Sequence, residues 1–414
     1  MEIFKDTNFD FLGKKWPFII ASLVLTVAGL ASIVMKGGIK YGIDFKGGAQ
    51  MRVKFASAPQ LDKIRSAMTD SKAIKGEVTV QSFRGAGVEN EVEIATELQD
   101  ESQLNINRQA MLDVLTVSFG QPGGGKLDFN NAGQATLADR LREPLMRAGV
   151  PVTEQQLQDV TRAILSHRDN QLSGLVTDFN QLSTVPGVNP GIINTLQQET
   201  YLAPFHVMQV QMVGPKVGAD LRNKAALATL YALGGMLIYI AFRFEWVYGL
   251  GAVLAVLHDT VITVGLFSIF NEEISMTVIA ALLTLVGYSM NDTIVIFDRV
   301  RENLKLTRRE SLERLMNHSI NQTLGRTVMT SGLTFLTAIA LFIWGGPVLH
   351  GFSFALVCGI IVGTYSSVFI ASPIVLFWHD WADKRKPRTP VAAPSAPAPA
   401  RAGVERKRPT KAVK

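Results

Sequence analysis

The chain is built from long apolar runs with almost no charge, separated by polar segments. A helix needs about 20 apolar residues to cross a bilayer core of ~30 Å. One such run precedes a long polar segment and five follow it, at 16–35, 225–242, 246–271, 274–291, 327–349 and 351–378. The pattern therefore predicts a polytopic α-helical membrane protein with six transmembrane helices, the last five of them within 223–380.

The first apolar run, 16–35, is longer than the apolar core of a secretory signal peptide, which has about 7–15 residues. Small residues at 28–32 keep a cleaved signal peptide as the alternative. Because of the length of the run, we expect it to remain in the protein as a membrane anchor.

Basic residues are unevenly distributed among the connections between runs. The connection 298–326 carries seven Lys and Arg residues and the segment 384–414 carries ten, whereas 271–273 carries none. Because Lys and Arg are retained on the cytoplasmic side, we predict cytoplasmic termini at 1–15 and 381–414. The polar segment 36–222 then lies on the opposite side of the membrane.

This outer segment has the alternating pattern of β-strands at its two ends. Strands are predicted at 50–55, 78–83, 92–96 and 206–213, with a helix at 59–71 between the first two. The order β-α-β-β-helix-β is typical of an α+β ferredoxin-like domain. About a hundred residues separate the last two strands, too many for one helix. We therefore predict a helical insertion at about 98–200, with helices at 137–146 and 152–164.

Composition and charge exclude several classes of protein. Hydrophobic residues make up 47% of the chain and charged residues 18%, whereas soluble proteins carry about 25% charged residues. The net charge of +6 belongs to the tail, because 384–414 carries +9 and the rest of the chain −3. The fold thus offers no basic face for specific binding of nucleic acid. The tail is rich in Pro and Ala and is predicted to be disordered, serving either to bind anionic lipid or ribosomal RNA or only to fix topology.

Metal and cofactor sites find no support in the sequence. The single cysteine, Cys358, excludes a disulfide framework or a cysteine-rich metal site within the chain. The six histidines are scattered without ligand spacing. We therefore expect neither a metal nor a cofactor.

Charged residues inside apolar runs need an explanation, because each costs at least ~2.5 kcal/mol on insertion scales. Asp292 lies in the fourth run, flanked by Asn291 and Thr293, and Arg326 opens the fifth, antiparallel run. We expect the two charges within about one helical turn of the same depth. A carboxyl near an arginine stays ionised, whereas one in apolar surroundings holds its proton. A mobile Arg326 would switch Asp292 between these states; the alternative is a permanent ion pair that locks two helices.

Two further groups of residues are candidates for a functional role. His258 and Asp259 lie in the middle of the third run, as a static hydrogen-bonded pair or as part of a proton relay. The second group, Gly42, Asp44, Gly47 and Gly48, follows directly after the first run. These glycines suit either a hinge or a tight turn.

Several motifs together resemble one known family. They lie at 41–48, 213–218, 243–245, 258–259, 287–293, 297–303, 322–327 and 363–367. In this order they are similar to the SecF branch of the SecD/SecF family of protein-export membrane proteins, part of the resistance-nodulation-division superfamily. The similarity covers about 10–97 and 201–380, and Ala49 after the two glycines departs mildly from the family pattern.

The resemblance implies a function, a location and partners. Such a subunit acts with SecD beside the SecYEG channel in the bacterial inner membrane, with its large domain in the periplasm. It pulls the translocating polypeptide outward after the ATP-driven stage, using the proton or sodium gradient. Asp292 and Arg326 match the ion-coupling positions of the family, with Asn291 and Thr293 beside Asp292. YajC, YidC and membrane lipids are the further partners implied.

Three other functions are weighed against this one. An ion-independent scaffold of the translocase would need no buried carboxyl. A small-molecule or lipid exporter of the same superfamily usually has two homologous halves, and no second copy occurs here. An intramembrane aspartyl protease would need two carboxyls at one depth, but Asp259 and Asp292 are expected at different depths. We therefore predict a transport subunit and not an enzyme.

Overall fold

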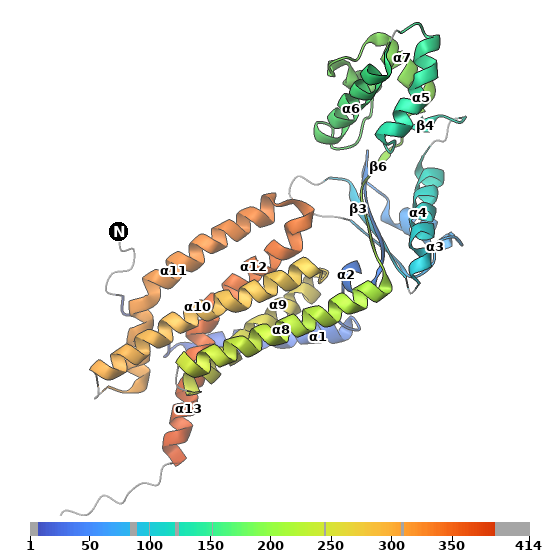
Figure 1. Cartoon of the computed structure of the whole chain (residues 1–414). Coiled ribbons are helices and arrows are strands. Elements are labelled where there is room, and N and C mark those ends of the chain that lie inside the picture. The colour runs from blue at the N-terminus through green and yellow to red at the C-terminus, as the bar shows by residue number, and fades with distance from the viewer. Residues whose placement is uncertain are drawn as a thin grey trace, which may run out of the picture.

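The structure, a computed structural model, describes residues 7–385 except 83–88, 99, 121–123, 151, 244, 245, 308 and 309. A bundle of long helices forms one end of the molecule, and a sheet domain followed by a small helical unit forms the other (Figure 1). The predicted basic tail from 386 onward, and two residues of the motif at 243–245, lie outside the described residues.

The bundle confirms the predicted six transmembrane helices. Six helices in the described part of the chain are long and apolar enough to span a membrane. They are α1 (Lys15–Met35), α8 (Pro215–Arg243), α9 (Trp246–Phe270), α10 (Met276–Leu306), α11 (Leu312–Trp344) and a last helix made of α12 (Gly346–Ser366), a π-helical turn (Ser367–Ala371) and α13 (Ser372–Arg385).

Several helices extend beyond the apolar runs that predict them. The connection expected at 298–326 is largely helical, because α10 and α11 continue past the apolar runs and bury Val300, Leu315 and Met316 in the bundle core. The tail boundary predicted at 381 is too early. Helix α13 continues to Arg385, and its Trp378 and Trp381 rings lie 5.4 Å apart.

Helix α1 is held against α9 by glycine and by hydroxyl groups. A Cβ atom on Gly29 would lie 2.7 Å from the Cα atom of Gly265, so a larger residue at either position would force the helices apart. The hydroxyls of Ser32 and Ser268 are 2.8 Å apart. Small residues of this kind drive close helix packing in membranes.

The segment before α1 is bound to the side of α11. Asn317 Oδ1 accepts the backbone N–H of Phe11 at 2.8 Å, and Asn321 Oδ1 accepts that of Phe9 at 2.8 Å. The two amide nitrogens donate to the carbonyl of Phe9 at 2.9 and 2.8 Å. Leu12 is fully buried in the bundle core. The chain therefore enters α1 from a fixed position at the end of the bundle opposite the sheet (Figure 1).

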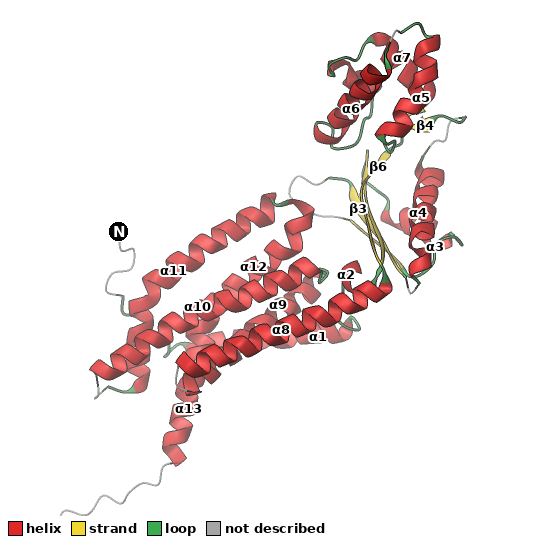
Figure 2. Cartoon of the chain, in the orientation of Figure 1, coloured by secondary structure: helices red, strands yellow, loops and turns green. Residues whose placement is uncertain are grey.

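The sheet domain confirms the predicted ferredoxin-like fold. Four antiparallel strands have the order β2-β3-β1-β6, and α3 and α4 cover one face (Figure 2). Alternate strand residues such as Met51, Val53 and Ile94 pack on this face against Met111 and Leu115 of α4. The elements are β1 (Gly48–Phe55), α3 (Leu61–Asp70), β2 (Val78–Ser82), β3 (Glu91–Glu97), α4 (Leu104–Phe119) and β6 (Phe205–Val213).

The helical insertion begins later than the predicted residue 98. Since α4 is the second helix of the sheet domain, the separate unit starts after it. It has its own core, which includes Phe129, Leu137, Ile164 and Leu196. Its elements are β4 (Leu127–Asp128), α5 (Gln134–Arg147), α6 (Glu154–Asn170), α7 (Pro190–Glu199) and β5 (Thr200–Tyr201). Two 3-10 turns, Glu101–Gln103 and Phe179–Thr184, and the short helix α2 (Ile43–Lys46) also lie outside the bundle.

Candidate functional site

Asp292 lies inside the bundle, on α10, with 2% of its surface exposed. Its Oδ2 atom accepts a hydrogen bond of 2.8 Å from Ser331 Oγ on the neighbouring α11. The next residue, Thr293, is fully buried, and its hydroxyl lies 3.0 Å from that of Ser367 in the π-helical turn. Asp292 is therefore a buried carboxyl that accepts one hydroxyl group from the neighbouring α11, and the next position of α10 is tied by a second hydroxyl contact to the π-helical turn. Single π-helical turns are frequent at functional sites.

Arg326 does not form an ion pair with Asp292. Its side chain is exposed, and within the described ranges no acid lies within 4.0 Å of its guanidinium. Arg326 precedes Ser331 by five residues, or ~7.5 Å along α11. The arginine is therefore offset from Asp292 by more than the predicted single turn, because the longer α11 places Ser331 level with the acid. Arg326 still attracts the Asp292 carboxylate electrostatically, and Asn291, the residue before Asp292 on α10, is exposed.

Asp259 is a second buried carboxyl, with 1% of its surface exposed. It accepts hydrogen bonds from Ser289 Oγ at 2.5 Å and from Ser366 Oγ at 2.7 Å, and it lies 2.8 Å from His258 Nδ1. The other ring nitrogen of His258 contacts the hydroxyl of Ser22 on α1. Asp259 and His258 therefore connect α1, α9, α10 and α12 through one polar network.

Two buried hydroxyls lie close in sequence to the charged pair. Tyr288 precedes Asp292 by one helical turn, and Thr327 follows Arg326. Within the described part of the chain neither hydroxyl has a hydrogen-bond partner. Buried polar groups normally have a partner in the protein or in water. These two hydroxyls therefore have hydrogen-bonding capacity that the described residues do not use.

The signature residues after α1 lie where the sheet domain meets the bundle. The short helix α2 (Ile43–Lys46) contains Asp44, and Gly42 precedes it with an ordinary φ of −71°. Gly47 and Gly48 have φ values of +78° and +146°. A Cβ atom on Gly48 would lie 1.9 Å from the carbonyl oxygen of Thr96. This contact explains why glycine is required here for a tight turn. A hinge role for the glycine pair stays a prediction.

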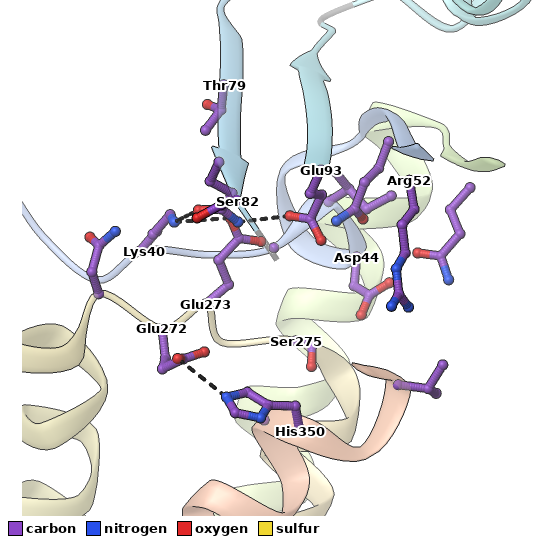
Figure 3. A pocket seen from close by; sticks show the side chains of 18 of the residues that line it. Lys40, Asp44, Arg52, Thr79, Ser82, Glu93, Glu272, Glu273, Ser275 and His350 are labelled. Atoms are coloured by element: carbon purple, nitrogen blue, oxygen red, sulfur yellow. Dashed lines mark hydrogen bonds and ion pairs between the residues drawn. The ribbon is translucent and has the colours of Figure 1, made fainter. Parts of the chain in front are cut away.

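A polar cavity of about 1020 Å³ lies beside this turn, between the open face of the sheet and the ends of α9, α10 and α12 (Figure 3). Lys40 Nζ is 3.2 Å from Glu273 Oε1, and His350 Nε2 is 3.4 Å from Glu272 Oε1. Glu93 projects into the cavity from β3. Gln81 of β2 accepts a hydrogen bond from Lys40 at 2.7 Å and donates one to Glu273 at 3.2 Å, and so connects the sheet to the loop between α9 and α10.

Comparisons with known proteins agree with this arrangement. The family model "Protein export membrane protein SecD/SecF, C-terminal" matches residues 193–381, and "SecD/SecF GG Motif" matches residues 33–59. A protein translocase subunit SecF from Koribacter versatilis is 47% identical over 408 residues, covering 96% of this chain and 98% of the relative. The chain belongs to the SecF family. A family member from Calditerrivibrio nitroreducens is 36% identical and covers 91% of this chain and 96% of its own length.

A solved structure is also similar to this SecF-family chain. The crystal structure of SecDF, a translocon-associated membrane protein from Thermus thermophilus, has a TM-score of 0.63 and 30% identity. The match covers 91% of this chain but only 39% of the SecDF chain. The SecF-family chain therefore spans about two fifths of that protein.

The sequence prediction missed the serines that hold the two buried acids. They are Ser289 and Ser366, which donate to Asp259, and Ser331, which donates to Asp292; no pattern in the sequence predicts them as hydrogen-bond donors. The available signal is weak. Serine is common in membrane helices, and only its orientation toward a carboxyl distinguishes a hydrogen-bond donor from a packing residue.

Glu93 should make the stability of the outer domain depend on pH. Burial raises its pKa above 4.5, and the negative charge of Glu273 raises it further. The folded chain then binds more protons than the unfolded chain at pH values just above 4.5, so stability falls as the pH rises through this window. In Glu93→Gln, the thermal unfolding midpoint of the full chain in detergent should decrease less as the pH rises through this window. Glu97→Gln, which changes an exposed acid on the same strand, is the control; equal curves for the parent and Glu93→Gln would contradict the assignment.

Proposed function

We propose that this SecF-family chain acts with SecD beside the SecYEG channel and draws the translocating polypeptide outward after the ATP-driven stage. A proton or sodium gradient drives this step. The observation that carries the proposal is the buried Asp292 carboxyl, whose hydrogen-bond partner Ser331 comes from a different helix. Such a carboxyl in a membrane bundle marks an ion pathway more often than a structural contact.

The ion step is a change in the charge of Asp292. In the ionised form the carboxylate accepts the Ser331 hydroxyl and is attracted by Arg326. In the neutral form it carries the proton, and Asn291, Thr293 and the free hydroxyl groups nearby complete its polar surroundings. One charge that crosses 100 mV releases ~2.3 kcal/mol. This energy is enough to bias one modest movement of the outer domain.

The His258–Asp259 pair is given a supporting role. Asp259 has three partners from three helices, an arrangement that favours a permanent connection over a changing charge. A relay role for His258 rests on its contact with Ser22, through which a proton could pass toward α1. The permanent connection is the assignment that we adopt.

The arrangement of the helices supports the proposed location. The segment from Thr7 to Gly13, the end of α10 and the start of α11 lie at the end of the bundle opposite the sheet (Figure 1). We therefore place the termini in the cytoplasm and the sheet domain and insertion in the periplasm of a bacterial inner membrane. SecD is the first partner, with YajC, YidC and membrane lipids as further ones. Protons or sodium ions act as the coupling ions, without a cofactor.

Export from reconstituted vesicles tests the proposal. The vesicles contain SecYEG, SecD and this chain, and a polypeptide is halted after its ATP-driven entry. Imposing a proton or a sodium gradient should restart its outward movement, and the effective ion is then the coupling ion. The scaffold alternative predicts the same rate of completion with either gradient and with none.

A further inference from the structure

The first turn of the sheet domain is attached directly to the beginning of α10. Asp44 Oδ2 accepts a hydrogen bond of 2.9 Å from the backbone N–H of Met276, the first residue of α10. The first N–H groups of a helix have no partner within the helix, and the helix dipole favours a negative charge there. Asp44 therefore adds a second cap to α10, besides Ser275, which accepts the N–H of Val278.

The neighbouring backbone strengthens this attachment. The N–H of Gly42 donates to the carbonyl of Ile274 at 3.0 Å, and the N–H of Ile274 donates to that of Lys40 at 2.8 Å. Phe45, with 3% of its surface exposed, packs in one core cluster with Ile274 and Val278. Figure 3 shows Asp44, Lys40 and Ser275 around the same cavity.

The other end of α2 is packed tightly and leads directly into the sheet. A Cβ atom on Gly47 would lie 2.6 Å from the Cα atom of Pro215 at the start of α8. Gly48 begins β1, which pairs with both β3 and β6. A displacement of α2 is therefore passed to a central strand of the sheet.

Helix α10 joins this attachment to the buried acid. It runs without a break from Met276 to Leu306 and contains Asp292. The acid lies ~24 Å from Met276 along the axis, at about 1.5 Å per residue. A shift or rotation of α10 that begins at Asp292 thus reaches Met276 within one rigid element.

We propose that Asp44 is the positioning residue that transmits movement of α10 to the outer sheet domain. Asp44 takes no part in ion transfer and acts only through the N-terminus of α10. The inference rests on the proposed function, since it requires α10 to move when Asp292 changes its charge.

Two thiol reporters test this transmission in the complex of the full chain with a cysteine-free SecD. Cys358→Ala removes the native thiol. Thr79→Cys then reports on the cavity, and, in a separate protein, Lys305→Cys reports on the far end of α10; both native residues are exposed. Maleimide labelling rates are measured in vesicles with and without the coupling gradient. We expect the gradient to change both rates in the parent.

Asp44→Ala should reduce the gradient response at position 79 by about fivefold, the effect of losing one helix cap, and leave the response at position 305 unchanged. Asp44→Asn keeps a capping oxygen and should retain most of the response. Lys46→Ala is the matched control, because Lys46 lies on the same helix but pairs with Glu97 of the sheet, at 2.9 Å. An unchanged response at position 79 in Asp44→Ala overturns the inference about Asp44 but leaves the proposed function standing. No gradient response at either position in the parent overturns the proposed function as well.

Discussion

Asp292→Asn should abolish the gradient-dependent part of export while the chain stays folded and bound to SecD. Asparagine has nearly the same shape as aspartate and keeps an oxygen that can accept the Ser331 hydroxyl, so the contact between α10 and α11 survives. It cannot take up or release a proton in this range of pH. Because a positioned proton carrier contributes about 10²–10⁴-fold to proton transfer, the gradient-dependent rate should fall by at least about 100-fold. Completion of a halted polypeptide in vesicles measures it.

The matched control for this variant is Asp298→Asn, the same change further along α10. Asp298 is exposed and pairs with Arg243 at 2.9 Å. This variant should keep the gradient response, since an exposed ion pair contributes little. Co-purification with SecD and an unchanged unfolding midpoint show that both variants are intact. Full gradient-driven export by Asp292→Asn would remove the carboxyl from the mechanism and leave the scaffold alternative.

Arg326→Ala should lower the gradient-dependent export rate by about tenfold without weakening the association of the chain with SecD. The arginine is exposed and forms no ion pair with any acid of the described residues, so its removal opens no cavity and breaks no lock. It acts on Asp292 only through electrostatic attraction over the offset between the two groups. Attraction between two unit charges ~7.5 Å apart amounts to about 2 kcal/mol at an effective dielectric constant of ~20 and is weaker for an exposed group, which corresponds to about tenfold. The same halted-polypeptide measurement applies.

Arg326→Lys separates charge from shape at this position. Lysine keeps the positive charge but lacks the planar, forked geometry of arginine. It should therefore restore most of the rate lost in Arg326→Ala if attraction to Asp292 is the function of Arg326. Loss of SecD from the complex in Arg326→Ala would instead support the permanent-lock alternative.

The sheet could be predicted from the sequence because one of its faces is buried and its strands alternate with a period of two. The expected strands at 50–55 and 206–213 end at the same residues as β1 and β6 and begin only two residues and one residue later. The start of the insertion could not be predicted in this way. Helix α4 buries the polar Asn107 together with Met111, because Asn107 bonds to the backbone of Lys75, and this polar position hides the helical pattern.

The buried acids could also be predicted, but their surroundings could not. A single charge in an apolar run stands out, as Asp292 and Asp259 do. Which helix supplies the hydrogen-bond partner depends on the rotation of each helix, and this rotation leaves no trace in the local pattern. The contact between Asp44 and Met276 joins residues 232 positions apart, and no local rule connects them.

The attachment of the first residues to α11 has a consequence for how the protein is made. Phe9 leaves the ribosome long before Asn321, its partner 312 positions later. The leading segment must therefore wait, exposed at the membrane surface, until the fifth helix has been inserted. Final closure of that end of the bundle is a late event in biogenesis. A truncated nascent chain that stops before Asn317 would leave this segment open to protease.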